Sequence, residues 1–318
     1  MARKLFLVVC LALAISGCSS SDNANDGVKK LTVAVAAPGL PFLQLYVADE
    51  KGLFKKHGLD VEFVSVEGSA AATAAVQSGS ADVTVSLPEG VITAQAAGAP
   101  LKIIGATVNK NLYKMFVADG IKSLSDLAGK KIAMLTEGNG TDIQARLLLD
   151  KEGAGQAKSS FVATGALPNR LAAVKNGQVS GALLFPPFDL VAEKQGLKSL
   201  FSLDQLTEGY PNEVVATSQK AIKAKAESLQ AFMDAIVEAA AYITGNFDEA
   251  VAVGVKVTGS PEPEVRQSLQ DMLSALSKDG SVSPSGLSEV IDAMDAYSNF
   301  DKLPTVKESY DDQFVDAS

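Results

Sequence analysis

Few residues of this sequence are of the types that usually carry out enzymatic chemistry. Histidine occurs once, at His57, and there are two cysteines, Cys10 and Cys18. Without a second histidine or a thiol in the body of the chain, neither a Ser–His–Asp nor a Cys–His catalytic set can be assembled. Metal sites also usually need more histidines or cysteines than this. We therefore predict no catalytic residue, no metal site and no cofactor.

The single histidine and a glycine-rich run both have ordinary structural explanations. His57 follows two lysines at the expected end of a helix, where a cation interacts favourably with the helix dipole. The run Gly138-Asn139-Gly140-Thr141 is not a P-loop, because no Gly-Lys-Ser/Thr ending follows it. Carboxylate pairs such as Glu67 with Glu89 remain open as acid–base partners, although solvated or hydrogen-bonded carboxylates are the commoner case.

Small and polar residues follow six expected strands, three in each half of the chain. In open α/β sheets, ligands bind at the carboxyl ends of strands, where such loops converge with helix N-termini. Ser69 and Thr141 fall where free backbone N–H groups suit an anionic or strongly accepting group, and aromatic residues supply flat apolar walls. Each loop taken singly also fits an ordinary turn, but their shared character favours a ligand site. The predicted ligand-binding residues are Pro38, Gly39, Phe42, Glu67, Gly68, Ser69, Ser86, Leu87, Pro88, Glu89, Glu137, Gly138, Asn139, Gly140, Thr141, Phe185, Pro186, Phe188, Tyr210 and Asn212.

Short β-rich runs alternate with helical patterns and would position these loops. Ser69 is expected to cap one helix, which Gly79 ends. The alternation predicts an α/β fold in which mainly parallel sheets are flanked by helices. Apolar stripes at helical spacing then predict a helical C-terminal cap that packs across one lobe. Strands are expected over 31–35, 59–64, 81–85 and 101–105, an early helix over 42–57, and the cap helices over 229–243, 265–276 and 287–297.

The two halves of the α/β region resemble each other. After a shift of 98 residues, the run 74–79 (Ala-Ala-Val-Gln-Ser-Gly) falls on 172–177 (Ala-Ala-Val-Lys-Asn-Gly), and Pro88 falls on Pro186. A helix, a glycine stop, a buried strand and a proline-containing loop therefore occur twice in the same order. Chance matching of common residues accounts for part of this, but the pattern predicts a duplicated architecture.

The first 27 residues do not belong to the fold. Basic Arg3 and Lys4 precede an apolar run over 5–15, which is shorter than the roughly 20 residues needed to span a bilayer but typical of a signal-peptide core. The run ends in Ile-Ser-Gly-Cys, which resembles a bacterial lipobox, so Cys18 is the expected lipidation site. Residues 1–17 are then the signal peptide and 18–27 a flexible tether. A plain secretory signal or a buried N-terminal helix are the alternatives.

Composition and charge restrict the partners. The chain has 318 residues, 47% of them hydrophobic, and a formal net charge of −9. This apolar content is that of a globular protein of about two domains. The acidic balance argues against nucleic acid as a partner, and a thiol-free exported body needs no disulfide. The protein is expected outside the cytoplasm, held to the membrane by lipid on Cys18, and monomeric.

Several blocks in the same order carry a family resemblance. The stretch 47–62, Val-Ala-Asp-Glu-Lys-Gly-Leu-Phe-Lys-Lys-His-Gly-Leu-Asp-Val-Glu, is similar to a block of the substrate-binding proteins of nitrate/sulfonate/taurine and thiamine-precursor (NMT1/THI5-like) ABC importers. The blocks 94–101, 123–133 and 172–177 resemble later parts of the same family. The resemblance extends from about Leu31 to Ala250 and rests mostly on structural residues, which do not identify a ligand.

The resemblance implies a type II periplasmic-binding-protein fold, whose two lobes close on a ligand by a hinge motion. Lobe 1 is expected to comprise residues 28–111 and 217–318, and lobe 2 residues 112–216. The implied partners are a small-molecule ligand, an ABC permease and its ATPase, and the membrane, with no nucleic acid. Eukaryotic pyrimidine-synthesising relatives use a cysteine cluster and a reactive histidine, both of which this chain lacks.

The ligand class and two rival functions stay open at this stage. Arg170 is the only cation near the predicted loops, and Glu67, Glu89 and Glu137 favour a nitrogen heterocycle such as an aminopyrimidine. A sulfonate or carboxylate is the alternative ligand. A ligand-presenting sensory lipoprotein is the first alternative function. An enzyme on the same fold, such as a chorismate-dehydratase-like protein or an exported hydrolase, is the second.

Overall fold

The computed structural model describes residues 28–36, 39–155, 159–207 and 209–315. The predicted signal peptide, Cys18, the tether and Pro38 lie outside the described residues. Within them, none of the helices combines the length and the apolar character that crossing a membrane requires.

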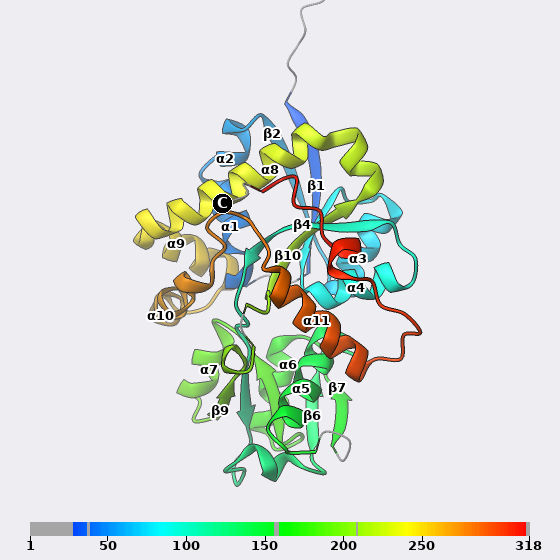
Figure 1. Ribbon diagram of the computed structural model, residues 1–318. Helices are drawn as coiled ribbons and strands as arrows, with labels where there is room; N and C mark the ends of the chain where they lie inside the picture. The colour runs from blue at the N-terminus through cyan, green and yellow to red at the C-terminus, as the bar shows by residue number, and fades with distance from the viewer. Residues whose placement is uncertain (1–27, 37–38, 156–158, 208, 316–318) are drawn as a thin grey trace, which may run out of the picture.

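Two five-stranded sheets, one above the other in Figure 1, organise the molecule. The first has the order β2-β1-β3-β10-β4 and the second the order β7-β6-β8-β5-β9. In each, the first three strands are parallel and the fourth is antiparallel to both neighbours. The strands are β1 (Lys29–Val35), β2 (Leu59–Ser65), β3 (Val83–Ser86), β4 (Leu101–Val108), β5 (Lys114–Val117), β6 (Lys131–Met134), β7 (Ser160–Ala163), β8 (Gly181–Leu184), β9 (Lys198–Ser202) and β10 (Glu213–Ser218).

The shared strand order confirms the mainly parallel α/β fold and explains the internal repeat. Strand β3 and strand β8, which the sequence repeat aligns, occupy the same third place in their sheets. Strands β1 and β6 likewise share the second place in their sheets. These central strands consist mainly of buried aliphatic or small residues, because helices cover both faces of a parallel sheet and exclude water from them.

The chain passes between the sheets twice. It leaves the first sheet after Val108 and enters the second at Lys114. It returns after β9, and the whole of β10 pairs with β3 and β4 of the first sheet. Residues 213–216, which were predicted in lobe 2, therefore lie in the first sheet, because they pair with β3 and β4 along with the rest of β10. Below, lobe 1 denotes the first sheet with its helices and lobe 2 the second.

Helices cover both sheets, and three C-terminal helices coincide with the predicted stripes (Figure 1). The α-helices are α1 (Leu43–Glu50), α2 (Leu53–Lys56), α3 (Gly68–Ser78), α4 (Pro88–Ala96), α5 (Gly140–Lys151), α6 (Leu167–Lys175), α7 (Phe188–Lys194), α8 (Gln219–Gly245), α9 (Phe247–Thr258), α10 (Glu262–Met272), α11 (Pro284–Tyr297) and α12 (Val306–Ser309). Short 3-10 turns lie at Leu40–Phe42, Leu124–Leu127, Leu203–Gln205 and Leu273–Ala275.

The C-terminal helices do not cover one lobe alone. Helix α8 packs on α1 and α2, and its stripe, which includes Phe232 and Ile236, is fully buried in the core of lobe 1. Helix α11 instead contacts both α4 of lobe 1 and α5 of lobe 2, and α10 contacts α7. The predicted cap therefore bridges the lobes, because α10 and α11 each contact elements of both.

Candidate functional site

A cavity of about 260 Å³ lies between the two lobes. Its walls are mostly apolar, with a few polar groups, as is usual for small-molecule sites. The carboxyl ends of β1, β2 and β3 meet those of β6, β7 and β8 here, which is where ligands bind in open α/β sheets. The lining residues are Ala36, Phe42, Glu67, Gly68, Ser69, Leu87 and Glu213 from lobe 1 and Tyr113, Leu135, Asn139, Thr141, Ala166, Leu167, Pro168, Arg170, Phe185 and Phe188 from lobe 2 or the passage leading to it.

Arg170 is the buried cation of this cavity. It stands in the first turn of α6 and is only 3% exposed. One Nη atom donates to the carbonyl of Leu183 at 2.9 Å, and Tyr113 lies close enough for the two side chains to affect each other's pKa. Its Nε atom is buried without a hydrogen-bond partner, and among the described residues no carboxylate lies within 4.0 Å of the guanidinium. Burial lowers the pKa of Arg170 from its ordinary value, and a buried arginine normally has a counter-ion.

Aromatic rings form the apolar walls. Tyr113 and Phe185 meet edge to face, with ring centroids 5.2 Å apart. Phe42 reaches the cavity from lobe 1, and Phe188 from the start of α7. Burial raises the pKa of the Tyr113 hydroxyl, so this group is a neutral hydrogen-bonding partner at physiological pH.

Two buried carboxyl groups lie beside the cavity. Glu213, the first residue of β10, lines it and is 3% exposed. Burial, and secondarily the Glu89 carboxylate, raise the pKa of Glu213 well above its ordinary value. Burial also raises the pKa of Glu89, although hydrogen bonds from Gln144 and Tyr210 oppose this shift. Burial therefore favours the neutral, protonated form of Glu213 in particular.

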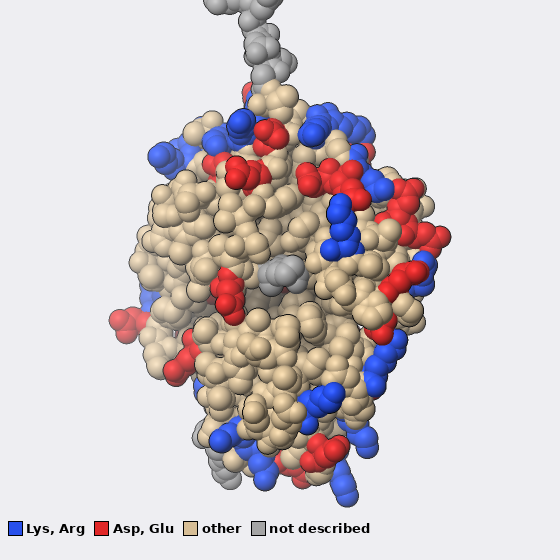
Figure 2. Space-filling model, turned by 180° about the vertical axis from the view of Figure 1, so that it is seen from behind, with Lys and Arg blue, Asp and Glu red and all other residues tan. Residues whose placement is uncertain are grey.

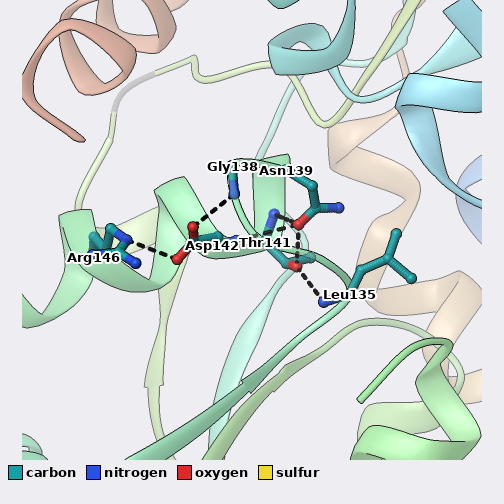
Figure 3. Close-up of polar contacts among 6 residues, drawn as sticks. All are labelled: Leu135, Gly138, Asn139, Thr141, Asp142 and Arg146. Carbon is teal, nitrogen blue, oxygen red and sulfur yellow. Dashed lines mark hydrogen bonds and ion pairs between the residues drawn. The ribbon is translucent and has the colours of Figure 1, made fainter. Parts of the chain in front are cut away.

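The N-terminus of α5 caps itself (Figure 3). Asn139 Oδ1 accepts from the backbone N–H groups of Thr141 at 3.0 Å and Asp142 at 3.3 Å, and from the Thr141 hydroxyl at 2.6 Å. Asp142 in turn accepts from the Gly138 N–H at 2.8 Å and from Arg146 at 2.7 Å. The expectation that the free N–H of Thr141 would meet a ligand is therefore wrong. The amide nitrogen of Asn139, however, is buried without a partner.

Helix α3 of lobe 1 has no such cap. Its N-cap residue is Glu67 rather than the predicted Ser69, and the Glu67 side chain makes no capping hydrogen bond. Gly68 has φ of +81°, and a Cβ there would lie 2.7 Å from Leu135 Cδ2 of the other lobe. A glycine is thus required where lobe 2 comes close to this helix terminus.

A buried hydrogen-bond network joins the lobes beneath the cavity. Glu89 Oε1, on α4, accepts from Gln144 Nε2 of α5 at 2.8 Å and from the Tyr210 hydroxyl at 2.7 Å. Gln144 Oε1 accepts from Asn111 in the first passage at 3.1 Å. Gly140 packs so tightly here that a Cβ would lie 2.8 Å from Glu89 Oε2. The lobes therefore interlock at this point.

The two passages between the sheets are also tied together. The Asn212 N–H donates to the Val108 carbonyl at 2.8 Å, and Asn212 Oδ1 accepts from the Leu112 N–H at 3.1 Å. These two hydrogen bonds hold the passages side by side where the chain joins the lobes.

The structure divides the predicted site residues into two groups. Those that line the cavity are Phe42, Glu67, Gly68, Ser69, Leu87, Asn139, Thr141, Phe185 and Phe188. Those that are described but do not line it are Gly39, Ser86, Pro88, Glu89, Glu137, Gly138, Gly140, Pro186, Tyr210 and Asn212. Of this second group, Glu89, Gly140, Tyr210 and Asn212 take part in the contacts between lobes or passages, whereas Glu137 and Gly138 are exposed.

Four important lining residues were not among the predicted site residues: Tyr113, Leu135, Arg170 and Glu213. Leu135 directly follows strand β6, so it could have been predicted from the tendency of ligands to bind at the carboxyl ends of strands. Arg170 lies three residues into a helix whose N-terminus was already placed at the site. Tyr113 and Glu213 lie at the two passages, and only the position of the passages shows that they reach the cavity.

On the face shown in Figure 2, few charged side chains lie in the centre, and most lie toward the ends and along the side edges of the molecule. His57 is remote from the cavity, since its ring pairs with Glu238 of α8 at 2.8 Å. Among the described residues, no group of three or more histidine, cysteine, aspartate or glutamate side chains is arranged to hold a metal ion.

Comparison with known proteins finds both similar sequences and similar structures. A binding protein of Brucella abortus is 31% identical over 154 residues, which cover 48% of this chain and 46% of that protein, so the match spans about half its length. A protein of known structure from Bordetella bronchiseptica is 24% identical with a TM-score of 0.79, covering 91% of this chain and 96% of the other. The alkanesulfonate-binding protein SsuA of Xanthomonas axonopodis pv. citri, solved with bound MOPS, is 17% identical with a TM-score of 0.76, covering 89% and 99%.

These structural likenesses show the periplasmic-binding-protein fold that the two matched sheets predict. The sequence comparison goes further, since the NMT1/THI5 like family profile matches residues 41–250, which include both passages and all but the earliest part of the cavity wall. On that match, the chain belongs to the NMT1/THI5-like family.

Proposed function

We propose that this protein is the extracytoplasmic solute-binding receptor of an ABC-type importer, which captures a small organic molecule and delivers it to a membrane permease. The observation that carries the proposal is the cavity itself, whose walls come from both lobes. A ligand there contacts both lobes at once and stabilises the closed arrangement, which the permease can then recognise. Membership of the NMT1/THI5-like family supports the same function.

Within that function, we propose a ligand with an anionic, oxygen-rich group on a compact apolar body, such as a sulfonate or a carboxylate. Arg170 and Asn139 both line the cavity, and Arg170 Nε and Asn139 Nδ2 are buried donors without a hydrogen-bond partner, which a ligand acceptor would satisfy. The uncompensated charge of Arg170 calls for an anion. Of the three acidic residues that favoured a nitrogen heterocycle, only Glu67 lines the cavity. Glu89 is engaged with Gln144 and Tyr210, and Glu137 is exposed outside the cavity.

The receptor would be exported and held at the membrane through lipid on Cys18. This part of the proposal rests on the apolar run over 5–15 and the lipobox-like residues 15–18. Metabolic labelling with a radioactive fatty acid should mark the full chain, and Cys18→Ser should abolish the label. Labelled Cys18→Ser protein would contradict the assignment.

Calorimetric titration of the purified protein with benzenesulfonate, benzoate and cytosine tests the function and the ligand class separately. We expect binding heat with a sulfonate or carboxylate, a smaller radius of gyration in solution scattering when the protein is saturated, and full recovery of the unchanged compound. Heat with cytosine alone would contradict the anion assignment. Conversion of the compound into a product would contradict the receptor role.

A further inference from the structure

The carboxyl group of Glu213 has one oxygen fixed and one free. Its Oε1 accepts from the side-chain amide of Asn212 at 3.1 Å. Because Asn212 Oδ1 already accepts from the Leu112 N–H, the orientation of that amide is determined and its nitrogen faces Glu213. Glu213 Oε2 is buried, has no partner, and belongs to a residue that lines the cavity. A polar atom with this burial and no partner indicates a missing hydrogen bond.

The surroundings of Glu213 decide whether Oε2 carries a proton. The titratable groups that interact with Glu213 are Glu89 from α4 and Tyr113 from the first passage. Arg170 from α6 acts on Tyr113, and Tyr210 from the second passage donates to Glu89. The guanidinium of Arg170 donates to the Leu183 carbonyl, and it forms no ion pair with Glu213 within 4.0 Å. The nearest charge that acts on Glu213 is the like charge of Glu89. A buried carboxyl with a like neighbour and no cation favours the neutral form.

We propose that Glu213 contacts the ligand in its protonated form. Its Oε2–H donates a hydrogen bond to an acceptor of the molecule that Arg170 and Asn139 hold. This inference rests on the proposed function and adds a specificity determinant to it. Ligands with an acceptor at that point satisfy Oε2, whereas ligands without one leave a buried donor unpaired. Ionised Glu213 would also repel an anion, so capture requires that the proton stays on the carboxyl.

Because of where Glu213 lies, the loss of its proton also affects the segments that join the lobes. Glu213 is the first residue of β10 and pairs with Val108, the last residue of β4, so it lies where both passages meet lobe 1. Loss of its proton therefore places a buried negative charge beside these segments and in the cavity at once. We expect ligand affinity to fall as the pH rises through the pKa of Glu213, because only the protonated form donates.

The experiment compares wild type with Glu213→Gln, Glu213→Leu and the control Glu137→Gln, an equal substitution at an exposed carboxyl outside the cavity. The probes are benzenesulfonate and benzoate, neither of which titrates between about pH 6 and about pH 9. We expect wild-type and Glu137→Gln affinity to fall by up to about tenfold per pH unit on the alkaline side. Glu213→Gln keeps a neutral donor and should bind equally across the range, whereas Glu213→Leu should bind about tenfold more weakly even in acid.

An infrared difference spectrum of wild type minus Glu213→Gln at neutral pH provides an assay that needs no ligand. We expect the C=O stretch of a protonated carboxyl in wild type and its loss in the variant; absence of this band overturns the proposal. A pH profile shared by wild type and Glu213→Gln, with probe bound, overturns the role of Glu213 and leaves the receptor function intact. If neither anion binds wild type or any of the variants, the proposed ligand class is contradicted and this inference with it.

Discussion

Helices α3 and α6 occupy equivalent places in the two sheets, since each follows the edge strand of its parallel trio and each has its N-terminus at the cavity. Neither has a side-chain cap. Yet the sequence repeat that aligns them places Arg170 of α6 opposite Ala72 of α3. Ala72 is fully buried in the core of lobe 1, whereas Arg170 presents its guanidinium to the cavity.

The difference shows which features come from the shared architecture and which come from the individual ligand site. The common strand order brings two sets of loops to one crevice, so the place of the site follows from the repeat. The charge follows from a departure from the repeat at one position. Lobe 2 therefore supplies the cation and the amide donor, and lobe 1 supplies the close glycine-lined approach and the carboxyl groups.

Replacing Arg170 by methionine removes this difference between α3 and α6 and should have the largest effect. A charge-assisted hydrogen bond to a ligand contributes about 1.5–3 kcal/mol, so we expect about a 100-fold loss in affinity for benzenesulfonate or benzoate, measured by calorimetry. The folded protein should keep its stability, since the buried cation has no counter-ion to lose.

Arg146→Met is the matched control for this change. Arg146 also belongs to lobe 2, but it pairs with Asp142 at 2.7 Å and lies over the ring of Phe161 at 4.0 Å, outside the cavity lining. Its loss should leave binding unchanged. Equal losses for both variants would mean that positive charge on lobe 2 in general, rather than Arg170, attracts the anion.

Gly140→Ala tests the approach of the lobes without touching the ligand site. The new Cβ would lie 2.8 Å from Glu89 Oε2 and 2.8 Å from Leu87 Cδ1, both on lobe 1. Because such contacts exclude full closure, we expect about a tenfold weaker affinity and a larger radius of gyration with ligand present, by solution scattering. Gly245→Ala, where a Cβ meets nothing within 4 Å, should match wild type in both measurements. Normal closure of Gly140→Ala would show that the lobes have room to shift.

Much of this organisation could be predicted from the sequence, because it depends on local patterns. Alternation of strands and helices, glycine stops and the repeat all reflect backbone requirements, and they located the crevice correctly. The roles of Glu89 and Tyr210 could not be found in this way. Their side chains meet 121 residues apart in sequence, and the orientation of each is determined by the other lobe and passage.

The cap of α5 is an instructive intermediate case. Asparagine is among the best N-cap residues, so Asn139 could have been assigned that role from sequence, and Thr141 would then have lost its free N–H. Glu213 and Tyr113 gave no local signal, since a residue at the end of a strand looks the same whether or not a ligand cavity lies beside it.

The buried carboxyl pair of lobe 1 should make stability depend on pH. Burial raises the folded-state pKa of Glu89 above its ordinary value of 4.5. Between that value and the raised one, the folded state binds more protons than the unfolded chain, so the free energy of unfolding falls as the pH increases. We expect a decrease of about 1–2 kcal/mol between mildly acidic and alkaline pH in chemical denaturation. Glu89→Gln should reduce the slope, and an unchanged slope would assign it to other groups; Glu137→Gln is the control.

The smallest effect is expected at the outer contact between the lobes. The Tyr297 hydroxyl of α11 donates to Asp150 of α5 at 2.9 Å, at an exposed position. Desolvation raises the pKa of Tyr297 to about 12, so the hydroxyl stays protonated and donates over the physiological range. Because water competes for both groups, Tyr297→Phe should weaken ligand binding by no more than about twofold, measured by calorimetry. A loss as large as that of Gly140→Ala would mean that the C-terminal helix, rather than the buried interlock around Glu89, holds the lobes closed.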